Sequence, residues 1–441
     1  MLSYFKDLAS LTVLAHRGFT VIGGFIVSLI IVSFLNIQDQ GYYFVLVNLL
    51  ALQTLFEASF FHSILMKTSK YRNFIDYQEG NWILKSDSEE FCVFAKNTLI
   101  AFLKFSALGF LVISLLGSFF FLKDFYESNT NLLFKVWFFM TFSGFSLLFV
   151  NSFLFLLEGL NHVTKANSYR LFYVIFFNTL LCLFLILDLK LYAYPLALSI
   201  SVLALIFLIY SLDKKIISKI FFTKIKYSWN LNLEPLQKKL FISSFTGFIL
   251  FSIFTPLTFN LSSIEEAAVL GLTLSVLAGV ISISCSYGWS KFPVLLSLYI
   301  DSMREEFFFY IKRTILTTAI IFMIASSLTL LVIYYIPLFS SFFEQRVVPE
   351  AYFYILFCGA LFNVFMNVFS YFVRSTGDEP LVGQSIITLC LAILFLPFLI
   401  YKYGLTGSVT GYLLINLFSF LYVLIIFYKF KGNWTKSLKN Q

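Results

Sequence analysis

Long apolar stretches alternate along this chain with short polar connectors. A helix needs about 20 apolar residues to cross about 30 Å of hydrocarbon, and twelve stretches reach that length. The pattern therefore predicts an all-α polytopic membrane protein with about 12 transmembrane helices. We place the spans at residues 12–35, 42–66, 98–122, 134–157, 169–188, 192–212, 239–261, 267–290, 313–337, 351–373, 383–401 and 405–428.

Basic residues occupy alternate connectors between these spans. Of the 31 Lys and Arg residues, 25 lie on one side of the predicted membrane, five lie on the other, and Lys104 lies within the third span. Because basic loops stay in the cytoplasm, we expect both termini to be cytoplasmic. The net charge of +8 is explained by the basic residues of these connectors, so we expect no nucleic acid partner.

Composition excludes several classes of protein. The chain is 59% hydrophobic and 12% charged, whereas soluble domains carry about 25% charged residues. The five Cys residues form no CxxC pair and no disulfide framework, and no phosphate-binding GxxxxGK[ST] motif is present. We therefore expect no enzyme, no cofactor and no metal site. Helical spans also indicate a bacterial inner membrane, since outer-membrane proteins are barrels.

A Lys-rich connector divides the spans into two sets of six. We expect an N-terminal six-helix lobe at 1–212, a cytoplasmic basic linker at 213–238, and a C-terminal six-helix lobe at 239–441 that ends in a short basic cytoplasmic tail. Within the linker, residues 216–227 alternate Lys with Ile and Phe. This stretch is either an amphipathic helix on anionic headgroups or a solvated connector.

Several short motifs resemble those of polysaccharide flippases, in the same order along the chain. They are Phe34–Tyr43 at the first outer turn, Leu55–Ser59 in the second span, Glu158–Asn161 after the fourth, Phe292–Pro293 and Leu298–Asp301 after the eighth, and Phe372–Arg374 after the tenth. The chain resembles the O-antigen flippases (Wzx-like) of the multidrug/oligosaccharidyl-lipid/polysaccharide exporter (MOP) superfamily. Glu57 stands where that family usually has Asp, and Ser59 where it has Gly.

This resemblance implies a fold and a function. The fold would be a MATE-like, V-shaped pair of six-helix lobes. The function would be to carry an undecaprenyl-diphosphate-linked oligosaccharide, such as an O-antigen repeat unit, from the inner to the outer leaflet by alternating access. An H⁺ or Na⁺ gradient would supply the energy. Membrane lipids, a polysaccharide polymerase and a chain-length regulator would be partners.

Cations within or beside the spans are candidates for binding the diphosphate. A charged side chain at the centre of a span costs about 2.5–3.5 kcal/mol, so Arg17 and Lys104 stand out. Both are expected to face a cavity, where Arg makes paired hydrogen bonds to phosphate oxygens. Lys291 and Arg374 mark inner helix ends and complete the predicted set. The alternative for Arg17 is that it extends to the inner headgroups.

Two further residues lie deep in the second span. Glu57 is expected to be an ion-coupling carboxylate or only a salt-bridge partner of Lys104, and His62 lies beside it, nearer the cytoplasm.

Two other functions compete with the flippase. A MATE-type drug/cation antiporter calls for deep acids and aromatic residues. A membrane glycan polymerase calls for essential residues on the outer face, where the only basic residues are Lys123, Lys135, Lys190, Arg346 and Lys402.

Overall fold

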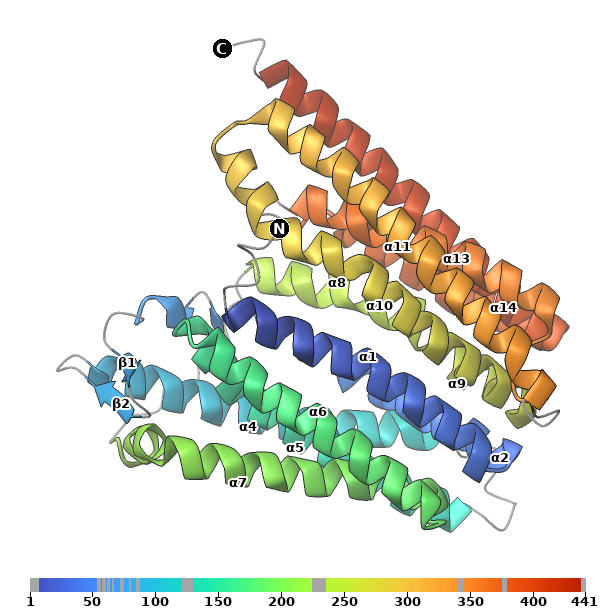
Figure 1. The fold of residues 1–441 in the computed structure, drawn as a ribbon, viewed down its shortest axis with the longest axis horizontal. Helices are drawn as coiled ribbons and strands as arrows, with labels where there is room; N and C mark the ends of the chain where they lie inside the picture. Colours follow the sequence, from blue (N-terminus) through green and yellow to red (C-terminus); the bar gives the residue numbers. More distant parts are fainter. Residues whose placement is uncertain are drawn as a thin grey trace. The chain divides into compact units, whose positions relative to one another are not determined.

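The structure, a computed structural model, consists almost entirely of long helices (Figure 1). It describes residues 8–53, 57, 61, 64–65, 67–71, 75–78, 81–84, 88–120, 130–223, 235–339, 345–374 and 379–437. The elements are α1 (Leu8–Phe34), α2 (Ile37–Leu50), β1 (Ile75–Gln78), β2 (Asn81–Leu84), α4 (Ser88–Phe120), α5 (Thr130–Gly159), α6 (Val163–Ile186), η3 (Lys190–Tyr192), α7 (Ala193–Phe222), α8 (Pro235–Phe251), α9 (Phe254–Leu261), α10 (Ile264–Ile300), α11 (Arg304–Phe339), α13 (Glu350–Arg374) and α14 (Val382–Ser437).

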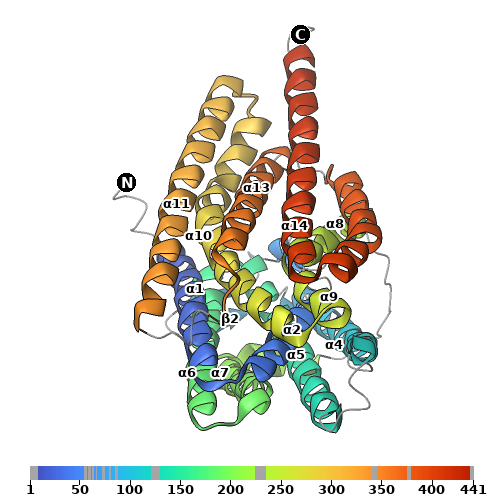
Figure 2. The same cartoon turned by 90° about the vertical axis from the view of Figure 1, so that its right-hand side faces the viewer.

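The described helices are long and apolar enough for a membrane protein. Nine of them qualify as spans, and α8 with α9, bent by 57°, would add a tenth. Two expected spans are merged in α14, which breaks at Gly404 (φ +54°, ψ −130°). Thr388 Oγ1 lies 3.1 Å from Ser419 Oγ, so the two halves of α14 lie side by side (Figure 2). The chain is a multi-pass membrane protein, as the hydropathy pattern predicted.

The structure divides the chain into two compact units. The first unit comprises Met1–Leu35 and Leu50–Gln237, and the second comprises Asn36–Leu49 and Lys238–Gln441. In the first unit, α1 packs against α6, while α4 packs against α5 and α7. In the second unit, buried side chains of α10, α13 and α14 form the main hydrophobic core.

Helix α2 packs with the second unit although it directly follows α1. A Cβ on Gly41 would lie 2.6 Å from both Ile264 Cγ1 and the Ile264 carbonyl oxygen, so glycine permits this close approach. The buried Gln40 amide donates to the Ala268 carbonyl and accepts from Arg346 Nη1, each at 3.1 Å. Residues 36–49, which we had placed in the N-terminal lobe, are therefore held by second-unit side chains.

The connectors contain more structure than the sequence indicated. Helix α7 continues to Phe222, so residues 213–222, expected in the linker, are helical. Strands β1 and β2, which we had not predicted, form an antiparallel hairpin within the connector 67–97. The remainder of the linker, 224–234, lies outside the described residues.

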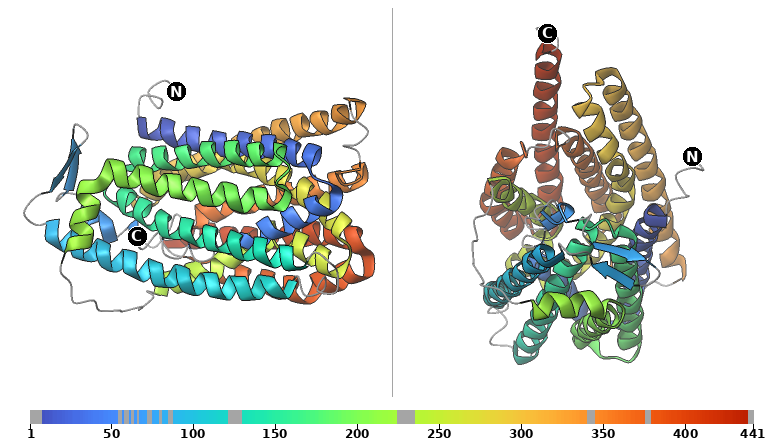
Figure 3. Two further views of the ribbon diagram at one scale, coloured as in Figure 1. Left: turned by 90° about the horizontal axis from the view of Figure 1, so that it is seen from below. Right: turned by 90° about the vertical axis from the view of Figure 1, so that its left-hand side faces the viewer.

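A buried carboxylate holds the hairpin to the helices of the first unit. Asp213 is fully buried and accepts hydrogen bonds from Trp82 Nε1 and Tyr169 OH, each at 2.6 Å. It also pairs with the Lys165 ammonium. A charge this deeply buried requires such partners. Helix α7 departs from helical geometry at Asp213, and its last turns bend away from the helix axis (Figure 3).

Candidate functional site

A cluster of polar and charged side chains lies among the helices of the first unit. Glu57 Oε1 accepts a hydrogen bond of 3.2 Å from Asn151 Nδ2 on α5. Arg170 on α6 forms a two-pronged ion pair with Glu158 at the end of α5, and both side chains act electrostatically on Glu57. Tyr173 lies one turn after Arg170 and also interacts electrostatically with the Glu57 carboxylate. We call Glu57, Asn151, Glu158, Arg170 and Tyr173 the first-unit polar cluster.

Helix α1 brings His16 and Arg17 close to this cluster. A Cβ on Gly23 would lie 2.2 Å from Asn178 Nδ2 on α6, so the absence of a side chain lets the two helices approach closely. Two turns earlier on the same face of α1, His16 is affected electrostatically by both Arg170 and Arg17. The glycine contact therefore sets the register that places α1 beside the polar cluster.

Arg17 lies on a face of α1 that carries small and polar side chains. Arg17, Thr20 and Gly24 are exposed, and Ser28 is buried at the end of the strip. Their spacing of three, seven and eleven residues from Arg17 places all four on one face of α1. Among the described atoms, nothing lies within 4 Å of a Cβ built on Gly24. We call Arg17, Thr20, Gly24 and Ser28 the α1 polar strip.

Lys104 lies in different surroundings. It is exposed on α4, and the residues at corresponding helical positions, Leu108, Leu111 and Leu115, are 56%, 59% and 66% exposed. The opposite face of α4 carries the glycines that pack against aromatic rings of α5. Such an apolar exposed face is typical of contact with lipid, and a Lys there can extend toward the headgroups. Arg17 and Lys104 thus lie on helices with different neighbours.

The other two predicted cations lie in the second unit. Arg374 makes a two-pronged ion pair with the buried Glu379, with distances of 2.8 and 3.0 Å. Its Nη2 also donates to Ser243 Oγ at 2.7 Å. Arg374 therefore joins the end of α13 to the middle of α8 and to the segment before α14. Lys291 is half-buried on α10, with Nζ 5.4 Å from the centre of the Tyr287 ring.

One predicted site residue, His62, lies outside the described residues. Among the described residues, no three His, Cys, Asp or Glu side chains gather where they would hold a metal ion.

Comparison with solved structures identifies the fold. An inward-facing multidrug resistance MATE transporter of the MOP superfamily aligns with TM-score 0.58 and 12% identity, over 97% of this chain and 96% of its own. An outward-facing structure of such a transporter aligns with TM-score 0.59 and 13% identity, over 98% of this chain and 97% of its own. The fold is that of a MATE transporter. The MATE multidrug transporter DinF-BH aligns with TM-score 0.57 and 15% identity, over 96% and 95%. No protein-family model and no curated protein matches the sequence.

Within this MATE fold, sequence reasoning found Glu57 and Arg17 but did not connect them. We had noted Glu158 within the motif that follows the fourth span, but its pairing with Arg170 was not predicted. The signal was present in the sequence, because the two residues flank a tight turn in which Asn161 has a positive φ of 70°. Opposite charges on both sides of a helix–helix turn are well placed to pair. Asp213, which we had placed at the start of the cytoplasmic basic linker, gave no such signal.

Proposed function

We propose that the protein is a flippase that moves an undecaprenyl-diphosphate-linked oligosaccharide from the inner to the outer leaflet of a bacterial inner membrane. Transport would occur by alternating access between the two units. The MATE fold supports a transporter, and the flippase-like motifs support a lipid-linked sugar as its cargo. An O-antigen repeat unit or a similar glycan fits this chemistry. A polysaccharide polymerase and a chain-length regulator would then use the product.

The observation that carries this proposal is Arg17 on the α1 polar strip. A guanidinium binds two phosphate oxygens at once, and the small side chains of Thr20 and Gly24 leave room beside it. The Ser28 and Thr20 hydroxyls would offer hydrogen bonds to sugar hydroxyls. Because each charged contact is stronger away from bulk water, Arg17 would contribute substantially to binding a diphosphate if the bound substrate excludes water from it.

The first-unit polar cluster would couple transport to an ion gradient. Protonation of Glu57, or Na⁺ binding to it, would weaken its attraction to Arg170. The ion pair between Arg170 and Glu158 would then change in strength. His16 lies within electrostatic reach of Arg170. A change at Glu57 would therefore reach α1 and the polar strip.

A MATE-type drug/cation antiporter is the second candidate. The observation that favours it is Glu57, a carboxylate inside the first unit that would attract cations. A glycan polymerase has less support, since the outer cation Arg346 is buried and donates to Gln40.

The two candidates can be separated in proteoliposomes. The assay measures how fast a fluorescent undecaprenyl-diphosphate-linked oligosaccharide becomes accessible to an external quencher. A hydrogen bond to a charged group is worth about 1.5–3 kcal/mol, so Arg17→Ala should weaken substrate binding by about 10- to 100-fold. Lys104→Ala is the matched control, because it removes a cation of the first unit that lies on the exposed apolar face of α4 and not on the α1 polar strip. Unchanged flipping by Arg17→Ala, with Glu57-dependent export of a cationic dye, would instead support the antiporter.

A further inference from the structure

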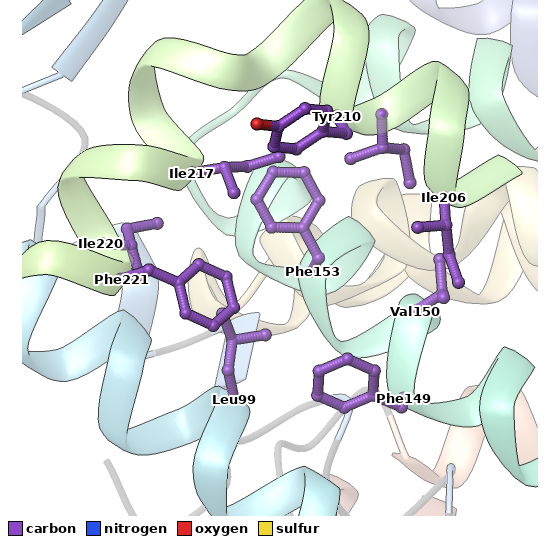
Figure 4. A pocket seen from close by; sticks show the side chains of 10 residues that line it. Leu99, Phe149, Val150, Phe153, Ile206, Tyr210, Ile217, Ile220 and Phe221 are labelled. Atoms are coloured by element: carbon purple, nitrogen blue, oxygen red, sulfur yellow. The ribbon is translucent and has the colours of Figure 1, made fainter.

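A pocket on the first unit is lined almost wholly by apolar side chains (Figure 4). Helix α4 contributes Leu99, α5 contributes Val150 and Phe153, and α7 contributes residues that include Ile217 and Phe221. The pocket has a volume of ≈ 190 Å³, compared with about 150 Å³ for an engineered cavity that holds benzene. It therefore has room for several methylene groups of one hydrocarbon chain.

The pocket lies near the inner ends of its helices, where the Lys-rich connectors are found. Phe153 is six residues before Gly159, which ends α5, so it lies about 9 Å from that end along the helix. Phe221 is the last residue but one of α7. With the basic connectors in the cytoplasm, as the sequence predicts, the pocket lies at the depth of the inner-leaflet acyl chains, next to their headgroups.

Two lysines lie at the headgroup side of this pocket. Lys96 is one turn before Leu99, and its Nζ donates to the carbonyl oxygens of Phe221 and Thr223 at 2.7 and 2.8 Å. Lys214 is exposed and precedes Ile217 and Phe221 by three and seven residues, which places it on the same helix face. The acids that begin α4 are farther away, since Glu89 lies about 15 Å along the helix from Leu99.

The bend of α7 at Asp213 produces this arrangement. Beyond Asp213 the last turns of α7 leave the direction of the preceding helix (Figure 3). This segment buries Ile216 and exposes Phe222 by 86%, and it also exposes Lys214 and Lys215. A short helix with apolar and Lys-bearing faces is suited to the membrane interface.

We infer that the pocket binds an anionic phospholipid of the inner leaflet. One acyl chain fills the pocket, and the headgroup phosphate lies against Lys96 and Lys214. The apolar lining accounts for the chain, and the two cations account for a preference for negative charge. This site lies on the α4–α5–α7 side of the first unit and does not depend on the proposed flippase activity.

Lipid binding to the full chain in neutral detergent tests this inference. Native mass spectrometry measures the affinity for dioleoyl phosphatidylglycerol and for dioleoyl phosphatidylcholine, which differ only in their headgroups. We expect one tightly bound phosphatidylglycerol, favoured about tenfold or more. One lysine contact near a lipid phosphate corresponds to about a fivefold change in affinity. Lys214→Gln should therefore weaken phosphatidylglycerol binding about fivefold and leave phosphatidylcholine binding unchanged.

Two further variants make the result specific to the pocket. Lys215→Gln is the matched control, because the Lys215 side chain leaves the helix on the opposite side from the pocket. The affinity of this variant for phosphatidylglycerol should stay within twofold of the wild-type value. Ile206 lines the pocket and is 43% exposed. Ile206→Trp should weaken the binding of both lipids, because the indole would occupy the space of the acyl chain without disturbing a packed core.

Equal binding of the two lipids would overturn the inference, as would equal effects of the two lysine variants. Displacement of phosphatidylglycerol by an equimolar amount of undecaprenyl phosphate, dependent on Lys214, would also overturn it, because the pocket would then hold the substrate's tail.

Discussion

Replacing Asp213 with Ala should destabilise the first unit strongly. The substitution removes a fully buried carboxylate and leaves the Lys165 ammonium, Trp82 Nε1 and Tyr169 OH without their acceptor. Breaking a buried ion pair by removing one partner costs about 3–5 kcal/mol. Removing a single donor by Trp82→Phe should cost only about 0.5–1.5 kcal/mol, because Asp213 keeps its other two partners.

Thermal unfolding of the purified protein measures this difference. For a unit of this size, 1 kcal/mol shifts the unfolding midpoint by about 2–4 °C. Asp213→Ala should therefore lower the midpoint by roughly 6–20 °C, and Trp82→Phe by a few degrees at most. Release of the hairpin should also shift the fluorescence of the buried Trp82 to longer wavelength in the Asp213 variant.

A double-mutant cycle with Lys165→Met decides whether the ion pair itself is responsible. Removing both partners leaves no uncompensated charge, so the double variant should be more stable than the sum of the two single effects predicts. Neighbouring charges show coupling energies of about 0.5–3 kcal/mol. Strict additivity of the two single changes, or a loss below about 1 kcal/mol for Asp213→Ala, would refute the reasoning.

Three further predictions concern close packing and a second ion pair. Gly23→Ala should lower the thermal midpoint, because its Cβ would lie 2.2 Å from a side chain of α6. Gly24→Ala should instead stabilise the helix by about 0.5–1 kcal/mol through helix propensity and raise the midpoint slightly. Gly41→Ala should destabilise the second unit by about 1–3 kcal/mol, since the new methyl group meets a backbone oxygen at 2.6 Å, and equal midpoints for this variant and wild type would contradict the packing. Glu379→Ala should cost about 3–5 kcal/mol by leaving Arg374 without its carboxylate, and the double replacement of both should recover part of that loss in the same assay.

Hydropathy predicted the helices well because few backbone structures are stable within lipid. Within hydrocarbon every N–H and C=O must be satisfied internally, so a long apolar stretch becomes a helix whatever its neighbours are. The break in α14 was also predictable, since the gap between two expected spans contains Gly404, which adopts a positive φ. The hairpin was not, because strands of four residues within a polar connector carry no periodic signal strong enough to distinguish them from a loop.

The candidate site was predicted only in part, for a related reason. A charge within a span is conspicuous in a sequence, but its partner is set by packing between helices. The pairing of Arg374 with Glu379 and of Lys165 with Asp213 emerges only in three dimensions. The difference between Arg17 and Lys104 was nevertheless available beforehand. At three, seven and eleven residues after Arg17 the chain has Thr, Gly and Ser, whereas after Lys104 it has Ala, Leu and Leu.

The division of the chain also bears on the proposed transport mechanism. The chain passes between the two units after Leu35, after Leu49 and after Gln237, so any relative motion of the units must be absorbed near these three places. After Leu49, helix α2 ends at Leu50 and the next two residues form a turn, which allows a change of direction without breaking helical hydrogen bonds. The other end of α2 is secured to the second unit by Gly41 and Gln40. The turn after α2 is therefore a point on this crossing where the chain can change direction, and it lies a few residues before Glu57. If Glu57 couples transport to an ion gradient as proposed, the ion would act close to that turn.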